Sequence, residues 1–236
     1  MSYKIYPLDC GSMVRERSIL LFQKDPGTKM DVTTLCFYIT DGKQKILVET
    51  AGEPADGTNH APYSQRPDQF LDKQLLKIGV DPKDIEMVIF THLHWDHASN
   101  NHLFPNAKFY VQKTELQYAA CPLEIQRHYY NIPLIFQTSY EALEGDEELL
   151  EGILAITTPG HTPGSQTILV QGENKIYALL GDLVSAVEAW TATPRIINGI
   201  HTDVEACLTS MKKVAKYSNE VLPTHDVRVL GQNVYS

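Results

Sequence analysis

The sequence predicts an α/β protein in which two β-sheets lie between layers of helices. Short runs rich in branched and aromatic residues alternate with turn signals in both halves of the chain, and helical patterns follow them. Because sheets and amphipathic helices each have an apolar face to bury, this order favours layers packed around a shared core. With 236 residues the chain is long enough to bury such a core, and we predict one domain over residues 1–236.

The first half of the chain is expected to form most of one sheet and two helices. The predicted strands are residues 3–8, 33–40, 44–50, 85–90 and 108–111. The second and third of them form a hairpin around the turn Asp41-Gly42-Lys43. Helices are predicted over 67–78 and 114–120, and a loop containing glycine and proline is predicted over 51–65.

The second half adds four strands and one long helix. The strands are residues 153–157, 166–170, 175–180 and 220–222, and the helix spans 203–217, with Asp203 as its N-cap. The segment 118–140 is different, because it is aromatic, contains two prolines and has no clear period. Two interpretations of this segment stay open: an irregular layer of the core, or a lid that forms the wall of a pocket.

Composition excludes several classes of protein. The formal net charge of −9 argues against a nucleic-acid partner, which requires a basic surface. The four cysteines are far apart and contain no C-x-x-C pair, so we expect reduced, mostly buried thiols. No apolar stretch has the length of a membrane span, and the N-terminus has no signal-peptide pattern. We therefore expect a cytoplasmic protein without a membrane partner.

The stretch that follows the strand over 85–90 is dense in metal-ligating side chains. Its sequence is Thr91-His92-Leu93-His94-Trp95-Asp96-His97. In open α/β sheets, ligands bind at the carboxyl ends of strands, which is where this stretch lies. Imidazole and carboxylate groups suit zinc or a similar divalent ion. We predict a metal site here, with His92 and His94 on one side of a short turn and Asp96 and His97 on the next bend, an arrangement that can serve two ions.

Three more ligand-type residues each follow the end of a predicted strand. They are His161, Asp182 and His225. Any one of them alone is typical of a polar loop, but three in this position support the same metal site.

The order of these seven residues resembles the metallo-β-lactamase fold superfamily over essentially the whole chain. The resemblance implies an αββα sandwich with a dinuclear metal site at the edge of its sheets. It also implies the ligand sets: His92, His94 and His161 for one ion, and Asp96, His97 and His225 for the other. Asp182 then bridges both ions, together with a hydroxide. Leu93 and Trp95 are expected to be spacers that pack into the core.

Within this superfamily the sequence most resembles the N-acyl homoserine lactonases. The resembling stretches are residues 46–50, 159–166 and 199–206. Two positions depart from that family. Glu49 stands where an aspartate is usual, which should change hydrogen bonding around the ligands. Ser185 stands where the lactonases have a tyrosine that is expected to touch the lactone carbonyl.

The resemblance implies a zinc-dependent hydrolase that opens a lactone by attack of the metal-bridging hydroxide, and the expected substrate is an N-acyl homoserine lactone. We expect two divalent ions, zinc being the first choice, and a small-molecule substrate. Asp96 is either a proton shuttle as well as a ligand, or a ligand alone. Candidate residues of the substrate pocket are Ser185, Tyr129, Tyr130, Trp190 and His201.

Other functions remain open for the same ligand set. The main alternative is a glyoxalase-II-like thioesterase, or a hydrolase of another lactone or ester. A nuclease is disfavoured by the acidic charge, and a flavodiiron oxidoreductase would be expected to have glutamate in place of His94. A metal-binding module without catalysis is disfavoured because the ligand set leaves room for a substrate. A homodimer is left open.

Overall fold

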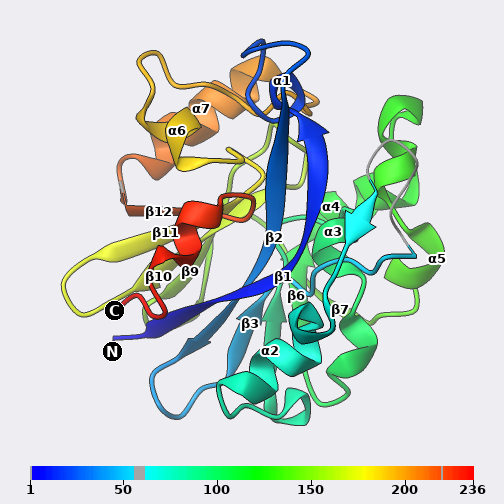
Figure 1. The fold of residues 1–236 in the computed structure, drawn as a ribbon. Coiled ribbons are helices and arrows are strands. Elements are labelled where there is room, and N and C mark those ends of the chain that lie inside the picture. Colours follow the sequence, from blue (N-terminus) through cyan, green and yellow to red (C-terminus); the bar gives the residue numbers. More distant parts are fainter. Residues whose placement is uncertain (1, 56–61, 219) are drawn as a thin grey trace.

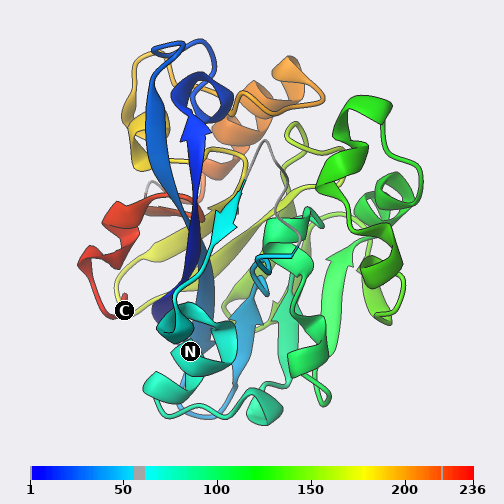
Figure 2. The same ribbon diagram turned by 45° about the vertical axis from the view of Figure 1, so that its right-hand side comes forward.

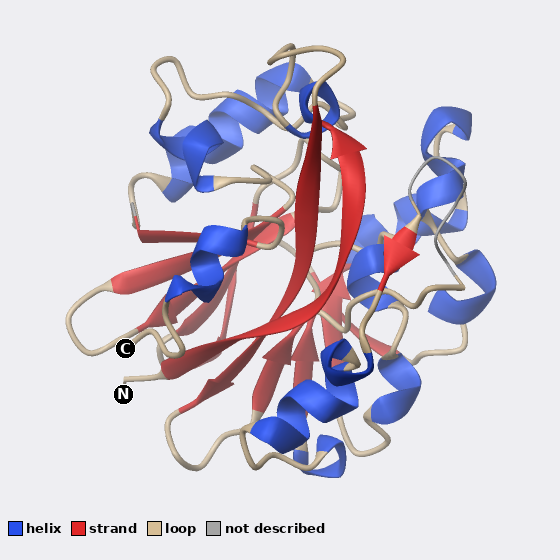
Figure 3. Ribbon diagram, viewed as in Figure 1, coloured by secondary structure: helices blue, strands red, loops and turns tan. Residues whose placement is uncertain are grey.

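The computed structural model describes residues 2–55, 62–218 and 220–236, and two β-sheets are its central feature (Figures 1 and 3). The strands of the first sheet are β1 (Lys4–Glu16), β2 (Lys29–Thr40), β3 (Ile46–Val48), β4 (Tyr63–Ser64), β5 (Met87–Ile89), β6 (Lys108–Gln112) and β7 (Tyr140–Leu143). Their spatial order is β4-β1-β2-β3-β5-β6-β7. Because β3, β5 and β6 are parallel neighbours, their carboxyl ends lie at the same edge of the sheet.

The second sheet has five strands. They are β8 (Glu147–Leu150), β9 (Ile153–Thr157), β10 (Gln166–Gln171), β11 (Ile176–Gly181) and β12 (Glu220–Pro223), in the spatial order β12-β11-β10-β9-β8. Both β9 and β11 are antiparallel to β10, and β12 is parallel to β11. The carboxyl ends of β9, β11 and β12 therefore share one edge of this sheet.

Helices cover the outer face of each sheet, as the two ribbon views show (Figures 1 and 2). The α-helices are α1 (Arg17–Leu20), α2 (Leu71–Lys77), α3 (Trp95–Ala98), α4 (Lys113–Ala120), α5 (Ile132–Ile135), α6 (Val187–Thr191) and α7 (Val204–Val214). Short 3₁₀ segments are Pro67–Gln69, Pro82–Asp84, Asn101–Leu103, Glu124–Tyr129 and Val227–Gly231. Buried residues of α2 and α4 pack on the first sheet, and those of α6 and α7 pack on the second.

The alternation of side chains along the strands divides the core into layers. In β2, Leu35, Phe37 and Ile39 point into the cluster between the two sheets, and Cys36 and Tyr38 point into the cluster under the helices. Successive side chains of a strand face opposite sides of a sheet, so a strand buried on both faces is apolar throughout. This confirms the predicted αββα sandwich of two sheets between helix layers.

Most predicted elements agree with the structure. The hairpin is confirmed by the antiparallel pairing of β2 with β3. Asp203 caps α7, since its carboxylate accepts a hydrogen bond from the backbone amide of Ala206 at 2.9 Å. Leu93 and Trp95 are buried in apolar clusters, as expected of spacer residues.

Other boundaries were wrong. The strand predicted over 3–8 extends to Glu16, because β1 pairs with β2 along a long two-stranded ribbon that its charged sequence does not indicate. The loop predicted over 51–65 contains β4, and its residues 56–61 lie outside the described residues. The helix predicted over 67–78 is interrupted at Phe70, whose extended backbone separates a 3₁₀ turn from α2. The helix predicted over 203–217 ends at Val214.

Two expectations from composition can be compared with the structure. Three of the four cysteines, Cys10, Cys36 and Cys207, are buried free thiols, and Cys121 is exposed. Within the described parts of the chain, none of the helices has both the length and the apolar character that crossing a membrane requires.

Candidate metal centre

The ligand-type residues meet because they follow strand ends that converge. The histidine-rich stretch 91–97 follows β5 of the first sheet, while His161, Asp182 and His225 follow β9, β11 and β12 of the second. The backbone amide of Gln166 donates to the carbonyl of Thr91 at 2.9 Å and joins the two edges. The structure thus brings together all seven ligand residues predicted from the sequence.

One group consists of His92, His94 and His161, all three buried. The Nε2 atom of His161 lies 3.2 Å from Nε2 of His92 and 3.0 Å from Nδ1 of His94. Burial lowers the pKa of each of these imidazoles below its usual value, so they are neutral near pH 7. Three neutral imidazoles that converge within this distance could hold a cation.

Hydrogen bonds assign the tautomers of two of these rings. Nδ1 of His161 donates to the carbonyl of Ile200 at 2.7 Å, which leaves Nε2 without a proton. The hydroxyl of Thr91 donates to Glu49 at 2.5 Å, so its oxygen accepts from Nδ1 of His92 at 3.1 Å. The facing Nε2 atoms of His92 and His161 therefore both present lone pairs, and a cation between them removes the repulsion.

The second group consists of Asp96, His97 and His225. Nε2 of His225 lies 3.6 Å from Asp96, and Nε2 of His97 lies 3.9 Å from the same carboxylate. Burial by itself lowers the pKa of both histidines, but Asp96 and Asp182 outweigh it and raise the pKa above the usual value. In the second group, therefore, carboxylates supply negative charge next to the histidines, which the first group of three imidazoles does not contain.

Asp182 lies between the two groups. Its Oδ2 atom is 3.5 Å from Nε2 of His161, and its Oδ1 atom is 3.5 Å from Nε2 of His97 and 3.0 Å from Nε2 of His225. Burial alone raises the pKa of this carboxyl, yet His225 and His97 hold it well below its usual range. One carboxylate that faces two ligand groups with separate oxygens has the geometry of a bridge between two cations.

Several buried polar atoms in the centre have no hydrogen-bond partner within the described residues. They include Nε2 of His97 and Oδ1 of Asp182, which lie 3.5 Å apart. A buried polar atom without a partner costs about 1–3 kcal/mol, so such atoms indicate a missing ligand. The donor set and its unpaired atoms fit divalent metal ions.

Glu49 supports the centre from a strained position. Its backbone has φ of +68°, which is uncommon for a residue with a side chain. The carboxylate accepts from the backbone amide of Thr91 at 3.1 Å and lies 3.5 Å from Nδ1 of His97. It also forms a third ligand-type group with His92 and His97. The glutamate that departs from the lactonase pattern thus lies beside a ligand.

Gly181 is required by close packing just before Asp182. Its φ is +53°, and a Cβ atom there would lie 2.2 Å from the hydroxyl oxygen of Thr91. Only glycine allows β11 to approach the histidine-rich stretch this closely.

The predicted pocket residues fall into three places. Tyr129 and Tyr130 lie beside the centre, with ring centroids 5.0 Å and 4.8 Å from that of His94. The hydroxyl of Ser185 is buried and accepts from the side-chain amide of Asn198 at 2.9 Å, and the same amide donates to the carbonyl of Asp182.

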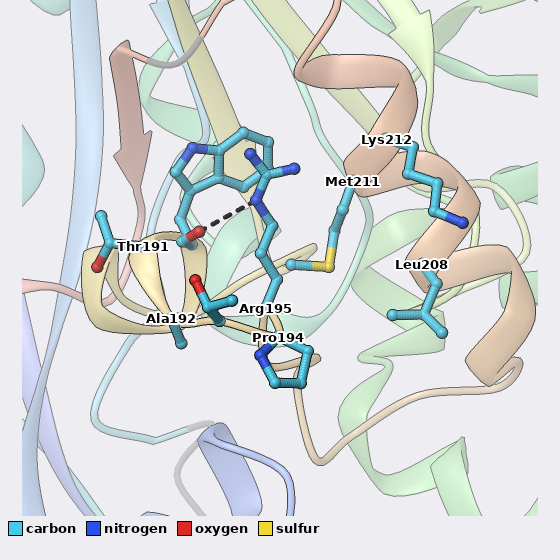
Figure 4. A pocket seen from close by; sticks show the side chains of 9 residues that line it. Thr191, Ala192, Pro194, Arg195, Leu208, Met211 and Lys212 are labelled. Carbon is cyan, nitrogen blue, oxygen red and sulfur yellow. Dashed lines mark hydrogen bonds between the residues drawn. The ribbon is translucent and has the colours of Figure 1, made fainter.

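His201 is joined to the same Asn198, whereas Trp190 lies apart from this arrangement. Nδ1 of His201 donates to the carbonyl of Asn198 at 2.8 Å, and the ring meets Phe22 edge-on. Trp190 belongs to the core cluster under α6 and α7 and contributes to a cavity of about 630 Å³. The guanidinium carbon of Arg195 lies 4.0 Å from the centroid of the Trp190 ring, and Figure 4 shows Arg195 among the side chains that line this cavity. None of the residues that line this cavity belongs to the ligand groups.

The residues that hold the ligand-type side chains in place were not predicted from the sequence. Glu115 is the clearest example, because it is fully buried and bonded to the loops around the histidines. In the sequence it looks almost the same as a solvent-facing glutamate at the start of a helix. Its spacing of four from Ala119, which is also buried, is the one signal that it lies on the inner face of α4.

Comparison with known proteins identifies the family. Residues 31–225 match the model of the metallo-β-lactamase superfamily, which is more than half of the chain. The chain therefore belongs to the metallo-β-lactamase superfamily.

Within this superfamily, the chain is similar to N-acyl homoserine lactonases. It is 26% identical over 227 residues to an N-acyl homoserine lactonase of a Bacillus species, covering 89% of this chain and 86% of the relative. It is 28% identical to the N-acyl homoserine lactonase of Bacillus cereus over 189 residues, or 75% of this chain and 74% of the relative.

A solved structure gives the same result. The crystal structure of a quorum-quenching N-acyl homoserine lactone hydrolase superimposes with a TM-score of 0.83 at 26% identity, covering 97% of this chain and 94% of that one.

Proposed function

We propose that this protein is a metal-dependent hydrolase that opens the ring of an N-acyl homoserine lactone. The proposed ligands of one divalent ion are His92, His94 and His161, those of a second are Asp96, His97 and His225, and Asp182 bridges the two. The observation that carries the proposal is the position of Asp182, whose two oxygens face different groups of ligands. Zinc is the proposed metal, because imidazole and carboxylate are its common ligands at catalytic sites.

The chemistry that the metal ions would supply is the same as at other sites with two divalent ions. When bound, two divalent cations lower the pKa of a shared water molecule and polarise the carbonyl of the substrate.

The protein's own residues orient this chemistry. The carbonyls of Ile200 and Thr33 accept hydrogen bonds from Nδ1 of His161 and His225, both at 2.7 Å. These bonds orient each ring so that Nε2 points into the centre and is available as a ligand atom. One anchor is a backbone carbonyl within β2 and the other is a backbone carbonyl in the loop before α7, so the orientation of both rings depends on the backbone rather than on mobile side chains.

Asp96 is proposed to transfer the proton that ring opening requires. The leaving oxygen of a lactone develops negative charge and needs a proton from a group within hydrogen-bond reach. The side chain of Asp96 is 12% exposed, whereas that of Asp182 is 7% exposed and that of His225 is 2% exposed. Since it is also the most exposed residue of the seven ligands, at 9%, it is the group best placed to meet both the substrate and solvent.

The choice of substrate rests on similarity to named lactonases along most of the chain. The test is a panel of lactones, thioesters, phosphodiesters and β-lactams, assayed with the zinc-loaded protein and with protein stripped by a chelator. We expect N-acyl homoserine lactones to give the highest kcat/KM, and the stripped protein to be inactive until zinc is restored. A higher kcat/KM with thioesters would instead support the glyoxalase-II-like alternative.

A further inference from the structure

Glu115 lies where the loops around the first group of histidines meet. The side chain extends from α4 and is fully buried. Its Oε1 atom accepts hydrogen bonds from the backbone amide of Leu93 and the hydroxyl of Tyr130, both at 3.0 Å. Its Oε2 atom accepts from the hydroxyl of Thr162 at 2.6 Å, and the amide of Gly164 also donates to the carboxylate. Four donors from three separate segments thus converge on one carboxylate.

We propose that Glu115 is a positioning residue that sets the places of His92, His94 and His161 relative to one another. The inference rests on the proposed metal centre, because these histidines are the proposed ligands of its first ion. Glu115 touches none of the reacting atoms and acts through the segments that hold the three imidazoles.

The contact with Leu93 controls two of the ligands. Leu93 is the single residue between His92 and His94, so the position of its amide limits where both rings lie. An amide that donates to a buried carboxylate forms one of the stronger hydrogen bonds of a protein interior. The distance of 3.0 Å therefore holds the backbone between the two histidines against α4.

The contacts with Thr162 and Gly164 control the third ligand. Thr162 follows His161 directly, and its hydroxyl reaches the other oxygen of the same carboxylate. Gly164 packs so tightly on α4 that a Cβ atom there would lie 2.1 Å from the backbone nitrogen of Glu115. The turn after β9 is thus fitted to α4 at this residue, and His161 is held opposite His92 and His94.

The contact with Tyr130 adds a ring to the same arrangement. The hydroxyl of Tyr130 binds Glu115, while its ring lies edge-on to His94 with centroids 4.8 Å apart. The ring of His94 is therefore bounded by a side chain whose position depends on Glu115.

The second group of ligands is held by other means. The backbone amide of Thr50 donates to the carbonyl of His97 at 2.7 Å, and the carbonyl of Thr33 orients His225. Within the described residues, the hydrogen bonds recorded for Glu115 reach no member of this group and no residue next to one in sequence. A change at Glu115 should therefore weaken the binding of the first ion selectively, whereas a general loss of protein stability would weaken the binding of both ions.

A carboxylate is required because all four neighbours donate. In Glu115→Gln one carboxylate oxygen is replaced by an amide nitrogen, which donates hydrogen bonds and cannot accept them. A hydroxyl such as that of Thr162 can rotate to accept, but the backbone amides of Leu93 and Gly164 cannot. The variant keeps the size of the side chain and removes its ability to satisfy all four donors.

The test measures metal binding in backgrounds that retain one group of ligands each. His225→Ala leaves the first group intact, and His161→Ala leaves the second. Each is prepared without metal, with and without Glu115→Gln, and titrated with Co²⁺, whose visible spectrum reports ligand geometry, and with Zn²⁺ by equilibrium dialysis. We expect Glu115→Gln to lower affinity about 10- to 100-fold in the His225→Ala background and to change the Co²⁺ spectrum there. In the His161→Ala background we expect no change.

Two further variants keep the test decisive. Thr162→Val removes one donor from the His161 side, and should cause a smaller loss confined to the same background. Asp146→Asn is the matched control, because Asp146 also accepts several hydrogen bonds but contacts no ligand of the centre. It should lower the melting temperature and leave both affinities unchanged.

The outcomes separate this inference from the proposed function. If the wild-type protein binds two ions and Glu115→Gln lowers both affinities equally, or neither, the inference is wrong and the dinuclear centre stands. If the wild-type protein takes up fewer than two ions after supplementation, the dinuclear centre is wrong and the inference fails with it.

Discussion

Asp182 is the residue on which the two halves of the centre depend. Each of its oxygens lies close to ligands of a different group, and the side chain is buried. In Asp182→Asn one of these oxygens becomes an amide nitrogen, which carries hydrogens and cannot ligate a cation. We expect the variant to bind both ions more weakly and to lose turnover.

The measurement is elemental analysis after dialysis against a fixed concentration of free zinc. His225→Ala serves as the comparison, because it removes a ligand of the second group only. A variant Asp182→Asn that retains two ions with wild-type affinity would exclude the bridging role.

Asp96 and Ser185 are expected to differ sharply in their effect on catalysis. Asp96→Asn removes a proposed proton donor and perturbs a ligand, so we expect kcat/KM to fall by about 10²-fold or more. The hydroxyl of Ser185 is engaged with Asn198 rather than directed at the ligand groups. Ser185→Ala should therefore cost less than about tenfold, or under ~1.4 kcal/mol of transition-state stabilisation.

Both variants must be compared at equal metal occupancy, measured on the same samples. If Ser185→Ala is as damaging as Asp96→Asn, Ser185 contacts the substrate directly. Three other residues are candidate hydrogen-bond donors to the substrate carbonyl. The hydroxyl of Tyr130 already donates to Glu115, and Nδ1 of His201 already donates to a backbone carbonyl. Tyr129 is half-buried beside His94.

At the scale of elements, the segment 118–140 contributes to the core, which is one of the two interpretations that its sequence left open, and the lid over a pocket stays a prediction. Tyr130 and Ile135 are buried in the core cluster, while Leu123, Ile125 and Phe136 are exposed, Ile125 by 75%. Exposed apolar side chains in a segment that also contains Tyr129 and Tyr130, the neighbours of His94, are typical of surfaces that receive an apolar ligand.

We therefore expect kcat/KM to rise with the length of the acyl chain of the substrate. Each methylene that becomes buried should contribute up to ~0.8 kcal/mol until the available surface is covered. The measurement is a series of N-acyl homoserine lactones, repeated with Ile125→Ser, which should flatten the slope. A slope that is already flat in the wild-type protein would make this segment structural only.

Asp146, in the turn between β7 and β8, forms an ion pair with Lys213 of α7. Its carboxylate accepts from the backbone amide of Thr157 at 2.8 Å and from Nζ of Lys213 at 2.7 Å. Burial by itself raises the pKa of Asp146, but Lys213 and Thr157 outweigh it, so the pKa lies below the usual 3.8. A lowered pKa in the folded state means that the ionised carboxylate stabilises the fold.

The sign of the pH dependence follows from that shift. The contribution of Asp146 is present above the unfolded pKa and is lost as the pH falls through the folded pKa. Because the pair is partly exposed and screened, Asp146→Asn should cost about 1 kcal/mol or less at pH 6. Urea unfolding of both proteins should show this difference narrowing below about pH 4. A difference that is constant down to pH 3 would contradict the assignment.

At the scale of the whole molecule, the metal centre connects the two sheets. Its ligands follow β5 of the first sheet and β9, β11 and β12 of the second, so bound ions hold the two edges together. A ligand that binds only the folded state stabilises it, by about 2.7 kcal/mol when its concentration is 100 times Kd. A chelator should therefore lower the melting temperature by roughly 5–10 °C for each ion lost.

Thermal unfolding followed by circular dichroism measures this effect. His225→Ala should show a smaller response to the chelator, because it starts with a weakened second site. Equal melting temperatures with and without chelator, at a concentration shown to remove the metal, would mean that the sheets are not connected through the centre.

The sequence by itself predicted nine of the twelve strands of the described residues, missing β4, β7 and β8, and it predicted the order of the ligand-type residues. Local patterns record these features, because a buried strand is apolar and a ligand must be a histidine or a carboxylate. Gly181 precedes Asp182, and Pro159 and Gly160 precede His161, so the end of each strand is also marked locally. The layered fold and the seven predicted ligand residues could be named on this basis.

Only the tertiary structure decided what surrounds the ligands. Glu115 is 22 residues from Leu93 and 47 from Thr162, and no local pattern encodes those hydrogen bonds. The long ribbon of β1 and β2 is likewise stabilised by pairing across the sheet rather than by its own composition. Trp190 was predicted to line the substrate pocket, yet packing places it under α7, in a cavity whose lining includes none of the ligand groups. The physical reason is the same in each case: local sequence determines which groups can ligate or be buried, whereas distant contacts determine where those groups lie.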